Sequence, residues 1–499
     1  MELEAINGDI LVLPFFGQGH LNPCVELCKY LSPYAKSRIV LIIPSHLSSS
    51  IPSALHPSIQ VLYIQVPPTE LGGGDRPHHA HGGDHLHQQM VQGIQSFLSE
   101  KYHVPGKTRP GCVVMDFMMN WCKDIFLRES IPIFPFFTSG AVSTAMEYAA
   151  WKANADDMKP GETRLLTGLP DCVALRYADT RRRDHHRGPR GGVGESDHRG
   201  PVGRNGFGHR EPGQAPRWLE EIDDFKALLI NTCHDLEGPF LDYLANQIDT
   251  VPVLGIGPLL PETYWRTTET FCRDRDSRSS NRESNHTEDE IIRWLDSKPT
   301  QSVVYISFGS EVGPTMEEYG QLADALEESR WAFIWVIQPG AGKPRPPPGT
   351  PNVDVHEGYN PMGLQEKVGE RGMIIMGWAP QLLILSHPST GGFLSHCGWN
   401  SSVEAMGRGV PILAWPIRGD QFYIARLAVD YLKIGAMVTS GDNLSEMAKK
   451  SDILEGIDMV MDDKEVHERA KNVRRMFEAG LPPTSKASIK TLVQLLNSN

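Results

Sequence analysis

Short runs of apolar residues alternate along the chain with longer segments in which apolar positions recur at helical spacing. This alternation predicts parallel β-sheets that are covered by helices on both faces. The strands expected in the first half are Ile10–Phe16, Arg38–Pro44, Ile59–Ile64, Cys112–Phe117, Ile131–Phe137 and Ala227–Thr232. The strands expected in the second half are Ser302–Phe308, Trp331–Ile337, Gly372–Gly377, Gly392–Ser395, Pro411–Trp415 and Gly435–Val438. The helices expected between the later strands include Thr315–Ser329 and Gln421–Leu432. Because the series begins again after the middle of the chain, two doubly wound α/β domains fit better than one large sheet.

The change from one series to the other marks a domain boundary near Leu254. The run Gly255–Pro261 (GIGPLLP) indicates the exit from the first domain, and Thr263–Glu290 is polar without periodicity. We therefore expect domains at residues 1–254 and 255–480, followed by a last segment at 481–499. Open α/β sheets bind ligands at the carboxyl ends of their strands, so function is expected in a cleft between the two domains.

Two segments break the pattern. Gly72–His87 is rich in histidine (His78, His79, His81, His85 and His87). It is either a metal-binding tract or a surface loop, and the loop is favoured because no periodic element would hold metal ligands in place. Arg176–Arg217 contains ten arginines, four histidines and nine glycines against five acidic residues. Nucleic-acid binding is one reading, but a disordered loop is favoured because the segment has almost no apolar residues to bury.

Composition narrows the function classes. The chain has 48 Lys and Arg against 61 Asp and Glu, a net charge of -13 that disfavours nucleic acid and anionic membranes as partners. The first residues lack the basic region of a signal peptide, and no run reaches the ~18 apolar residues of a membrane span. The eight cysteines show no CxxC spacing, which indicates reduced thiols. We expect a cytoplasmic, monomeric protein whose partners are small molecules.

The densest group of polar candidates lies in Gly391–Gly409 (GGFLSHCGWNSSVEAMGRG). A short strand, a glycine-containing turn and a helix preceded by N-cap residue types predict a phosphate site, because helix-start N–H groups and the helix dipole attract anions. The side chains of His396, Asn400 and Ser401 would add donors. An ordinary β–α connection with a capped helix remains the alternative.

Acidic and aromatic neighbours favour a nucleotide that carries a hydroxyl-rich group. Glu404 stands one helical turn after Asn400 and can accept two hydroxyl hydrogen bonds, as an acidic residue does for ribose in dinucleotide folds. Trp378 would stack on a base, and Gln381 would reach the ribose. Two further polar residues follow the strand at Pro411–Trp415, namely Asp420 and Gln421.

The segment Trp378–Gln421 (WAPQ…HCGWNSSVEA…GDQ) is similar in order and spacing to the signature box of plant family 1 UDP-dependent glycosyltransferases. Ser307–Ser310 (SFGS) and Asn231–Glu237 (NTCHDLE) resemble two further stretches of that family. The resemblance implies two Rossmann-like domains that face a cleft, the GT-B arrangement, with the last helix crossing back to the first domain. It also implies sugar transfer from a UDP-sugar to a flavonoid or other phenolic, with no metal or other cofactor.

The resemblance assigns the donor side residue by residue. The implied set is Trp378 for uracil with Ala379 beside it, Gln381 and Glu404 for ribose, Ser310, His396, Asn400 and Ser401 for the diphosphate, and Trp399, Asp420 and Gln421 for the sugar. Gln421 resembles glucose-using members, and Trp399 stands where some glucuronate users carry Arg, so glucose is favoured. Arg418 departs from the family pattern, and it either binds a carboxylate on donor or acceptor or points into solvent.

The first expected strand leads into Gly17–His20 (GQGH), with a helix expected to begin near Leu21. Asn22 replaces the third glycine of GxGxxG, which weakens a dinucleotide-dependent oxidoreductase. A histidine at the carboxyl edge of a strand suits a general base that works near neutral pH. Packing or capping at a helix start is the alternative for His20.

Asp116 ends the strand that begins at Cys112, so a parallel sheet would bring it to the same edge as His20. There it would accept the hydrogen bond from the imidazole and fix its tautomer, as the matching pair does in the resembling family; capping the next helix is the alternative. The resemblance places Gly19, Thr138 and Ser139 near the sugar and acceptor. The apolar stretch Phe117–Trp121, which includes Met118 and Met119, lines the acceptor entrance or belongs to the core.

These residues together predict an inverting transfer. His20 would remove a proton from an acceptor hydroxyl while Asp116 holds the ring, and the oxygen would attack the anomeric carbon of UDP-glucose. Donors at the expected helix start would stabilise the departing diphosphate. The alternatives are a UDP-glucuronate-using transferase, a non-catalytic nucleotide-sugar sensor, and a Rossmann oxidoreductase.

Overall fold

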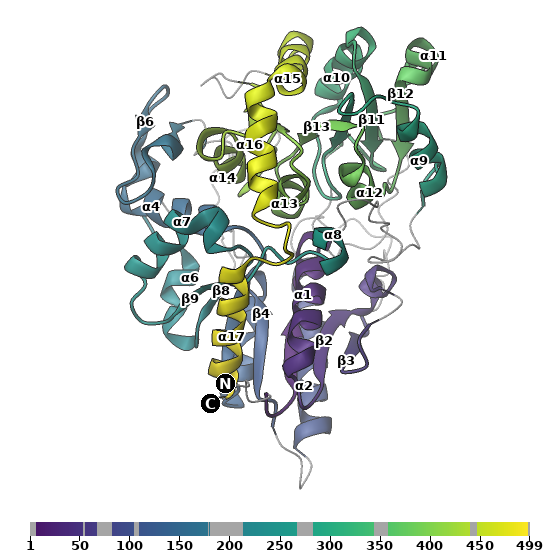
Figure 1. Cartoon of the computed structure of the whole chain (residues 1–499). Helices are drawn as coiled ribbons and strands as arrows, with labels where there is room; N and C mark the ends of the chain where they lie inside the picture. The colour runs from purple at the N-terminus through teal and green to yellow at the C-terminus, as the bar shows by residue number, and fades with distance from the viewer. Residues whose placement is uncertain are drawn as a thin grey trace, which may run out of the picture.

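The computed structural model of the chain describes residues 6–52, 55–66, 82–103, 109–177, 179, 213–266, 283–343, 358–439 and 447–497. Two α/β domains lie one above the other, each built on its own parallel sheet (Figure 1). Helices α1, α8 and α13 lie in the zone where the two domains meet (Figure 1). The predicted fold class of two doubly wound α/β domains is confirmed.

The first domain is built on a seven-stranded sheet in the order β3-β2-β1-β4-β5-β8-β9. Its strands are β1 (Ile10–Leu13), β2 (Ile39–Pro44), β3 (Ile59–Ile64), β4 (Cys112–Asp116), β5 (Ile133–Phe137), β8 (Leu228–Ile230) and β9 (Val253–Gly255). Its helices include α1 (Gln18–Leu31), α2 (Gly82–Tyr102), α3 (Lys123–Arg128), α4 (Ala141–Lys152), α6 (Arg217–Glu220) and α7 (His234–Gln247). A hairpin of β6 (Thr163–Arg164) and β7 (Leu175–Arg176) lies outside this sheet.

The second domain is built on a six-stranded sheet in the order β12-β11-β10-β13-β14-β15. Its strands are β10 (Val303–Ser307), β11 (Ala332–Ile337), β12 (Gly372–Met376), β13 (Thr390–Ser395), β14 (Ile412–Ala414) and β15 (Gly435–Met437). The helices that follow the first domain are α8 (Glu262–Arg266), α9 (Glu288–Asp296), α10 (Met316–Glu328), α11 (Leu364–Val368), α12 (Gln381–Ser386), α13 (Trp399–Arg408), α14 (Gln421–Arg426), α15 (Lys450–Asp462), α16 (Lys464–Arg475) and α17 (Pro483–Asn497).

The central strands are buried along their whole length because helices cover both faces of each sheet. All four residues of β1 are buried, as are all five of β10. This burial on both faces is typical of parallel sheets. Helix starts follow local sequence too: Thr315 caps α10, accepting a hydrogen bond from the Glu318 amide at 3.3 Å, while the Glu318 carboxylate accepts from the Thr315 amide at 2.9 Å.

Several predicted boundaries differ from the structure. Strand β9, which pairs with β8, was not predicted, and the expected domain end at residue 254 falls inside this last strand of the first sheet. The helix expected at Gln421–Leu432 is α14 followed by a π-helical turn at Leu427–Tyr431. The expected loop Gly72–His87 overlaps α2, which begins at Gly82; residues 72–81 lie outside the described ranges.

The last helix lies against the first sheet. Apolar residues of α17, including Ile489, Leu492 and Val493, pack in one cluster with the buried residues of β1 and α1. In Figure 1 α16 descends from the second domain and α17 continues onto the first, so the two chain ends lie close together. This return ties the far end of the chain to the domain where it began.

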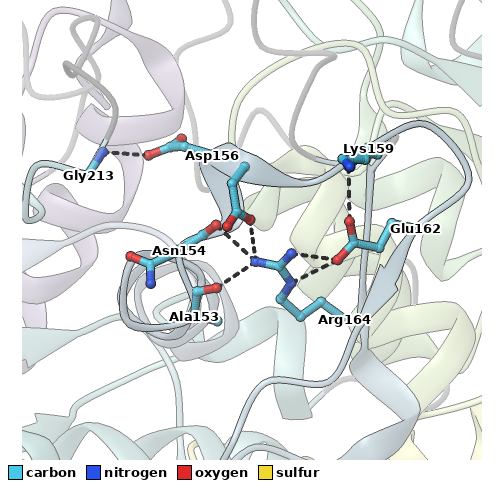
Figure 2. Close-up of polar contacts among 8 residues, drawn as sticks. Ala153, Asn154, Asp156, Lys159, Glu162, Arg164 and Gly213 are labelled. Carbon is cyan, nitrogen blue, oxygen red and sulfur yellow. Dashed lines mark hydrogen bonds and ion pairs between the residues drawn. The ribbon is translucent and has the colours of Figure 1, made fainter.

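A cluster of polar contacts fixes the end of α4 next to the hairpin. Figure 2 shows the Arg164 guanidinium among the carbonyls of Ala153 and Asn154, at 2.7 and 2.9 Å from Nη1, and the carboxylate of Glu162, 3.1 Å from Nε. The Gly213 amide donates to Asp156 at 2.8 Å in the same view. These bonds fix the chain before and after residues 180–212. These residues lie outside the described ranges and make up most of the Arg176–Arg217 segment.

Candidate active site

His20 lies in the first turn of α1 rather than on a turn before the helix. The helix begins at Gln18, not near Leu21, because Gly17 adopts extended dihedrals (φ -118°, ψ 156°) and serves as its N-cap. The helical backbone therefore fixes the position of the imidazole, whose side chain is 27% exposed. This location is at the carboxyl end of β1, where the sequence predicted it.

The carboxylate of Asp116 holds the His20 ring. Asp116 is the last residue of β4, which pairs in parallel with β1, so both residues reach the same edge of the sheet. Its Oδ2 lies 2.8 Å from His20 Nδ1, and its Oδ1 accepts a hydrogen bond from the Met118 amide at 2.9 Å. The Thr138 hydroxyl lies 2.9 Å from the same imidazole nitrogen and 3.4 Å from Oδ2. An acceptor at Nδ1 places the proton there and leaves Nε2 as the basic nitrogen.

The surrounding charges raise the pKa of His20. Burial by itself lowers it, but the charge and hydrogen bond of Asp116 outweigh burial, and the more distant charges of Glu311 and Asp420 act in the same direction. Both distant carboxylates belong to the second domain. The basicity of this histidine thus depends on how the two domains come together.

Within the described ranges, hydrogen bonds and a buried ion pair cross between the two domains, and we call this contact zone the seam. The Ser139 hydroxyl donates to Asp420 at 2.6 Å, and the Asn400 amide donates to the Gly19 carbonyl at 2.8 Å. Further contacts are the Trp399 indole on the Asn231 carbonyl at 2.8 Å and the buried pair Arg426–Asp179 at 3.1 Å.

Pro23 makes the Gly19 carbonyl available to the second domain. In a helix the carbonyl of residue i-4 normally accepts from the amide of residue i, and a proline has no amide hydrogen. Pro23 lies four residues after Gly19 inside α1, so this carbonyl has no amide donor at that position and accepts from the Asn400 side chain.

On the donor side, α13 begins with open amides next to the seam. Gly398 is its N-cap, with no side-chain hydrogen bond, and the helix begins at Trp399, so Asn400 and Ser401 lie inside the first turn rather than capping it as predicted. The first N–H groups of a helix attract anions, so the phosphate site stays a prediction at this position. Gly409 ends the helix with left-handed dihedrals (φ 67°, ψ 33°).

His396 lies between β13 and α13 and is buried. Burial lowers its pKa to about 4, although the nearby Ser307 backbone carbonyl acts against that shift; the charge of Arg418 lowers the pKa further. The ring is therefore neutral at ordinary pH. Its Nδ1 is buried with no hydrogen-bond partner among the described residues, which suits an atom reserved for a ligand.

The residues predicted for ribose converge. Gln381, at the start of α12, donates to Ser401 Oγ at 3.0 Å and to Glu404 Oε2 at 2.6 Å, and its carbonyl accepts from the Tyr305 hydroxyl at 3.1 Å. Glu404 is almost fully buried. Trp378 and Ala379 immediately precede this cluster, and the Trp378 side chain is half-buried.

The residues predicted for the sugar are engaged with the protein. The Trp399 ring packs against Gly140 and its indole bonds the first domain. Gln421 accepts hydrogen bonds from the Ile417 and Arg418 amides at 2.9 and 3.0 Å, and Ser310 is exposed on the turn after β10. The Arg418 guanidinium pairs with Glu311 of the same domain at 3.1 Å and stays partly exposed, so its role toward a ligand stays a prediction.

Three residues of the site were not assigned individually by sequence reasoning: Asn231, Glu237 and Glu311. Asn231 and Glu237 lie in NTCHDLE, which was singled out only as a structural stretch, and their full burial in the structure gives them weight. Glu311 follows SFGS directly, and no local pattern distinguishes it from a surface acid. Its place beside Gly17 follows from the domain arrangement.

Neither a metal centre nor a membrane segment emerges from the described ranges. No group of three or more His, Cys, Asp or Glu in them is placed to hold a metal ion. The histidine-rich stretch at residues 78–81 lies outside them. No helix in the described part of the chain is long and apolar enough to span a membrane.

The family model of UDP-glucoronosyl and UDP-glucosyl transferase matches residues 277–479. A flavonol 3-O-glucosyltransferase of Arabidopsis thaliana is 29% identical, covering 87% of this chain and 84% of the relative. A UDP-glucose flavonoid 3-O-glucosyltransferase of Fragaria ananassa is 26% identical, covering 86% and 81%.

Solved structures share the whole architecture. A UDP-glucosyltransferase of Polygonum tinctorium capable of glucosylating indoxyl superposes with a TM-score of 0.71 at 22% identity, covering 99% of each chain. A Phytolacca americana enzyme complexed with UDP-2fluoro-glucose and pterostilbene gives a TM-score of 0.69 at 21% identity, covering 99% of this chain and 100% of that one. The chain is therefore similar over most of its length to plant UDP-dependent glycosyltransferases, and its second domain matches the model of that transferase family.

Proposed function

We propose that this protein transfers glucose from UDP-glucose to a hydroxyl group of a small apolar acceptor, a flavonoid or another phenolic, with inversion at the anomeric carbon. The observation that carries the proposal is the imidazole of His20, held by Asp116 at 2.8 Å next to the seam where the start of α13 contacts α1. A base on one domain and an anion site on the other are the two groups that direct displacement at a sugar carbon requires.

In the proposed step, His20 Nε2 accepts the proton of the acceptor hydroxyl. The acceptor oxygen forms a bond to the anomeric carbon while the bond from that carbon to the β-phosphate oxygen breaks, and the electron pair leaves with UDP. Asp116 stabilises the imidazolium that forms, and the products are a β-glucoside, UDP and a proton.

The second domain supplies the donor site. Negative charge grows on the departing diphosphate, and the open amides of α13, with His396, Asn400 and Ser401, are donors fixed before the reaction begins. Gln381 and Glu404, joined at 2.6 Å, would bind the ribose hydroxyls. No metal or cofactor has a role in this step.

Two features support glucose as the sugar. Gln421 and Trp399 have the residue types of glucose-using members, and Arg418, the group best suited to a glucuronate carboxylate, is paired with Glu311. Both partners of that pair remain partly exposed, so UDP-glucuronate is the alternative donor to be compared.

Aromatic side chains near His20 support a phenolic acceptor. The Phe15 ring lies edge-on to His20 with centroids 5.2 Å apart. His87 of α2 stacks on Trp121 at 4.1 Å, and Phe16 lies 6.3 Å from His87. Flat apolar rings next to a base suit a flat aromatic alcohol. Of the predicted entrance residues, Phe117 and Met119 belong to the core, whereas Met118 and Trp121 are only partly buried.

The proposal is tested by incubating the protein with mixed plant phenolics and UDP-glucose, UDP-galactose or UDP-glucuronate in separate reactions. Mass spectrometry should detect hexose addition fastest with UDP-glucose, and NMR of the product should show the β-anomer. Faster transfer from UDP-glucuronate would overturn the glucose assignment. UDP binding without transfer to any phenol, thiol or amine would favour the nucleotide-sugar sensor.

The location is also part of the proposal. We infer that the enzyme works in the cytoplasm, because every cysteine in the described ranges is a free thiol, as is typical of a reducing compartment. Fractionation of cells that express a tagged chain tests this inference.

A further inference from the structure

The loop Thr138–Gly140, between β5 and α4, touches the catalytic pair and the second domain through all three of its residues. Its threonine hydroxyl lies 2.9 Å from His20 Nδ1, and its serine donates to Asp420 at 2.6 Å. Its glycine packs so closely on Trp399 that an added Cβ would lie 2.6 Å from the indole ring. The position of this short loop therefore sets the geometry of the base and of the seam together.

Glu237 holds the loop from behind. It sits where α7 is kinked, with non-helical dihedrals (φ -129°, ψ 32°), and its side chain is fully buried. Its Oε2 accepts from the Ala141 amide at 2.9 Å and its Oε1 accepts from the Val142 amide at 2.8 Å. Gly140, the N-cap of α4, makes no side-chain hydrogen bond, so a carboxylate from another helix performs the capping.

Asn231 holds the same loop from its other end. Its backbone amide donates to the Phe137 carbonyl at 2.9 Å, and its side chain donates to the Thr138 carbonyl at 3.2 Å. Its own carbonyl accepts from the Trp399 indole. Asn231 and Glu237, the first and last residues of NTCHDLE, thus form hydrogen bonds at the two ends of the Thr138–Gly140 loop.

A fully buried carboxylate is costly, and its retention requires strong partners. Two amide hydrogen bonds at the positive end of a twelve-residue helix are partners of this kind. An apolar residue at this position would leave both amides unpaired in the interior. A glutamine would offer one oxygen and present an N–H₂ group to an amide donor.

We propose that Glu237 is a positioning residue for glycosyl transfer, which holds the Thr138–Gly140 loop so that its hydroxyls meet His20 and Asp420. This inference rests on the proposed function for its rate effect and on the loop geometry for its structural effect. Glu237 acts through Thr138 and Ser139, because both of its oxygens are occupied by backbone amides.

The hydrogen bonds that Glu237 accepts from the Ala141 and Val142 amides should depend on pH. Burial raises the pKa of Glu237 to about 7, so the carboxylate becomes neutral, and accepts hydrogen bonds more weakly, as the pH falls through that value. The titratable groups in the described ranges that couple to it are Cys233 on its own segment and Tyr431 from the second domain. Burial raises the pKa of both, so they stay neutral as the pH falls.

The experiment compares Glu237→Gln with Asp235→Asn, an exposed acid in the first turn of the same helix. We expect Glu237→Gln to lower kcat about 10- to 100-fold, since small displacements of catalytic groups cost that much, and to change KM for UDP-glucose less than kcat. Asp235→Asn should leave both unchanged. In a Thr138→Val background the loss caused by Glu237→Gln should shrink several-fold, because the link to His20 is already cut.

Two outcomes would overturn the proposal. One is an unchanged kcat in Glu237→Gln, and the other is the same fold-loss in both backgrounds, which a general loss of stability would produce. Melting temperatures are measured for every variant to follow that effect.

A measurement on the unaltered protein tests the proposal even if the Glu237→Gln variant does not fold or the protein transfers no sugar. Hydrogen exchange of the peptide spanning residues 138–145 is compared at pH 8 and pH 6 and corrected for the intrinsic exchange rate. Lower protection at pH 6 confirms that the Glu237 carboxylate holds the loop, even if no acceptor is ever found. Equal protection at both pH values would contradict it.

Discussion

Two histidines near the seam follow central strands of their sheets, yet their surroundings put them in opposite states. His20, in the first turn after β1, is partly exposed and faces a buried carboxylate at 2.8 Å, which raises its pKa. His396, between β13 and α13, is buried beside a backbone carbonyl and near Arg418, and its pKa is lowered to about 4. The first side chain is equipped to take a proton, and the second is equipped to remain neutral.

The difference shows that the neighbouring groups, rather than the residue type or the secondary-structure element, set the protonation state of a histidine. Both histidines come shortly after a central strand, in stretches that a sequence pattern describes in the same way. The carboxylate of Asp116 comes from a neighbouring strand about a hundred residues away, and only the parallel pairing of β1 with β4 brings it to His20. The first domain is therefore expected to control the rate of transfer and the second to control UDP binding.

The largest effect should come from removing the base. We expect His20→Ala to lower kcat by about 10²–10⁴ while leaving the Kd for UDP almost unchanged, because the imidazole takes the proton and does not contact the nucleotide in the proposed step. Steady-state kinetics and titration calorimetry measure the two quantities. His56→Ala, an exposed histidine of the same domain, is the matched control. Loss of UDP affinity with normal turnover would reverse the roles given to the two domains.

Removing the charge that orients the base should come next. Asp116→Asn keeps the size of the side chain but no longer stabilises the imidazolium, and its amide group can face Nδ1 and favour the wrong tautomer. A fall in kcat on the order of 10²-fold is expected. The acid limb of the pH–rate profile should also move to lower pH, because the main charge that raises the pKa of His20 is gone. An unchanged profile would mean that Asp116 only caps the turn at Met118.

The expected role of the second domain in UDP binding is tested at His396. We expect His396→Ala to weaken UDP binding by about 10- to 100-fold, the cost of one lost hydrogen bond to a charged group. His396→Gln should recover part of the affinity, because glutamine keeps a donor. His286→Ala, a partly exposed histidine of the same domain, should have no effect in calorimetry. A variant with unaltered UDP affinity but slower turnover would give His396 a role in chemistry instead.

Most of the fold could be predicted because apolar runs report directly on burial. The strands of both sheets were located to within a few residues, since parallel strands are apolar on both faces and stand out from polar loops. The strand at Val253–Gly255 was missed because it is short and only partly buried, and the glycine-rich run after it indicated a linker. The starts of α1 and α13 were placed too late, because glycines rather than polar side chains cap them.

The site could be predicted where its residues follow strand ends and could not where it depends on the two domains meeting. His20 and Asp116 meet at the sheet edge as predicted, and Gln381 and Glu404, both expected at the ribose, contact each other; their roles toward a ligand stay predictions. No sequence pattern within one domain predicts that the Gly19 carbonyl, which has no amide donor at Pro23, accepts a hydrogen bond from Asn400. The ion pair that occupies Arg418 was missed for a different reason, because nothing local marks Glu311 as its partner.

The smallest effect should come from Glu311, which reaches His20 from across the seam. His20 must be neutral to act as base, so kcat/KM should fall as the pH drops through its pKa, which lies above the ordinary value of about 6.5. Glu311→Gln removes one of the charges that raise this pKa and frees the positive charge of Arg418, and both changes move the acid limb to lower pH. Because Glu311 is partly exposed, solvent screens its charge and the shift should be smaller than for Asp116→Asn. Glu317→Gln, an exposed acid a few residues further on, should leave the profile in place. A limb that does not move in Glu311→Gln would show that the charge of Glu311 does not contribute to the basicity of His20.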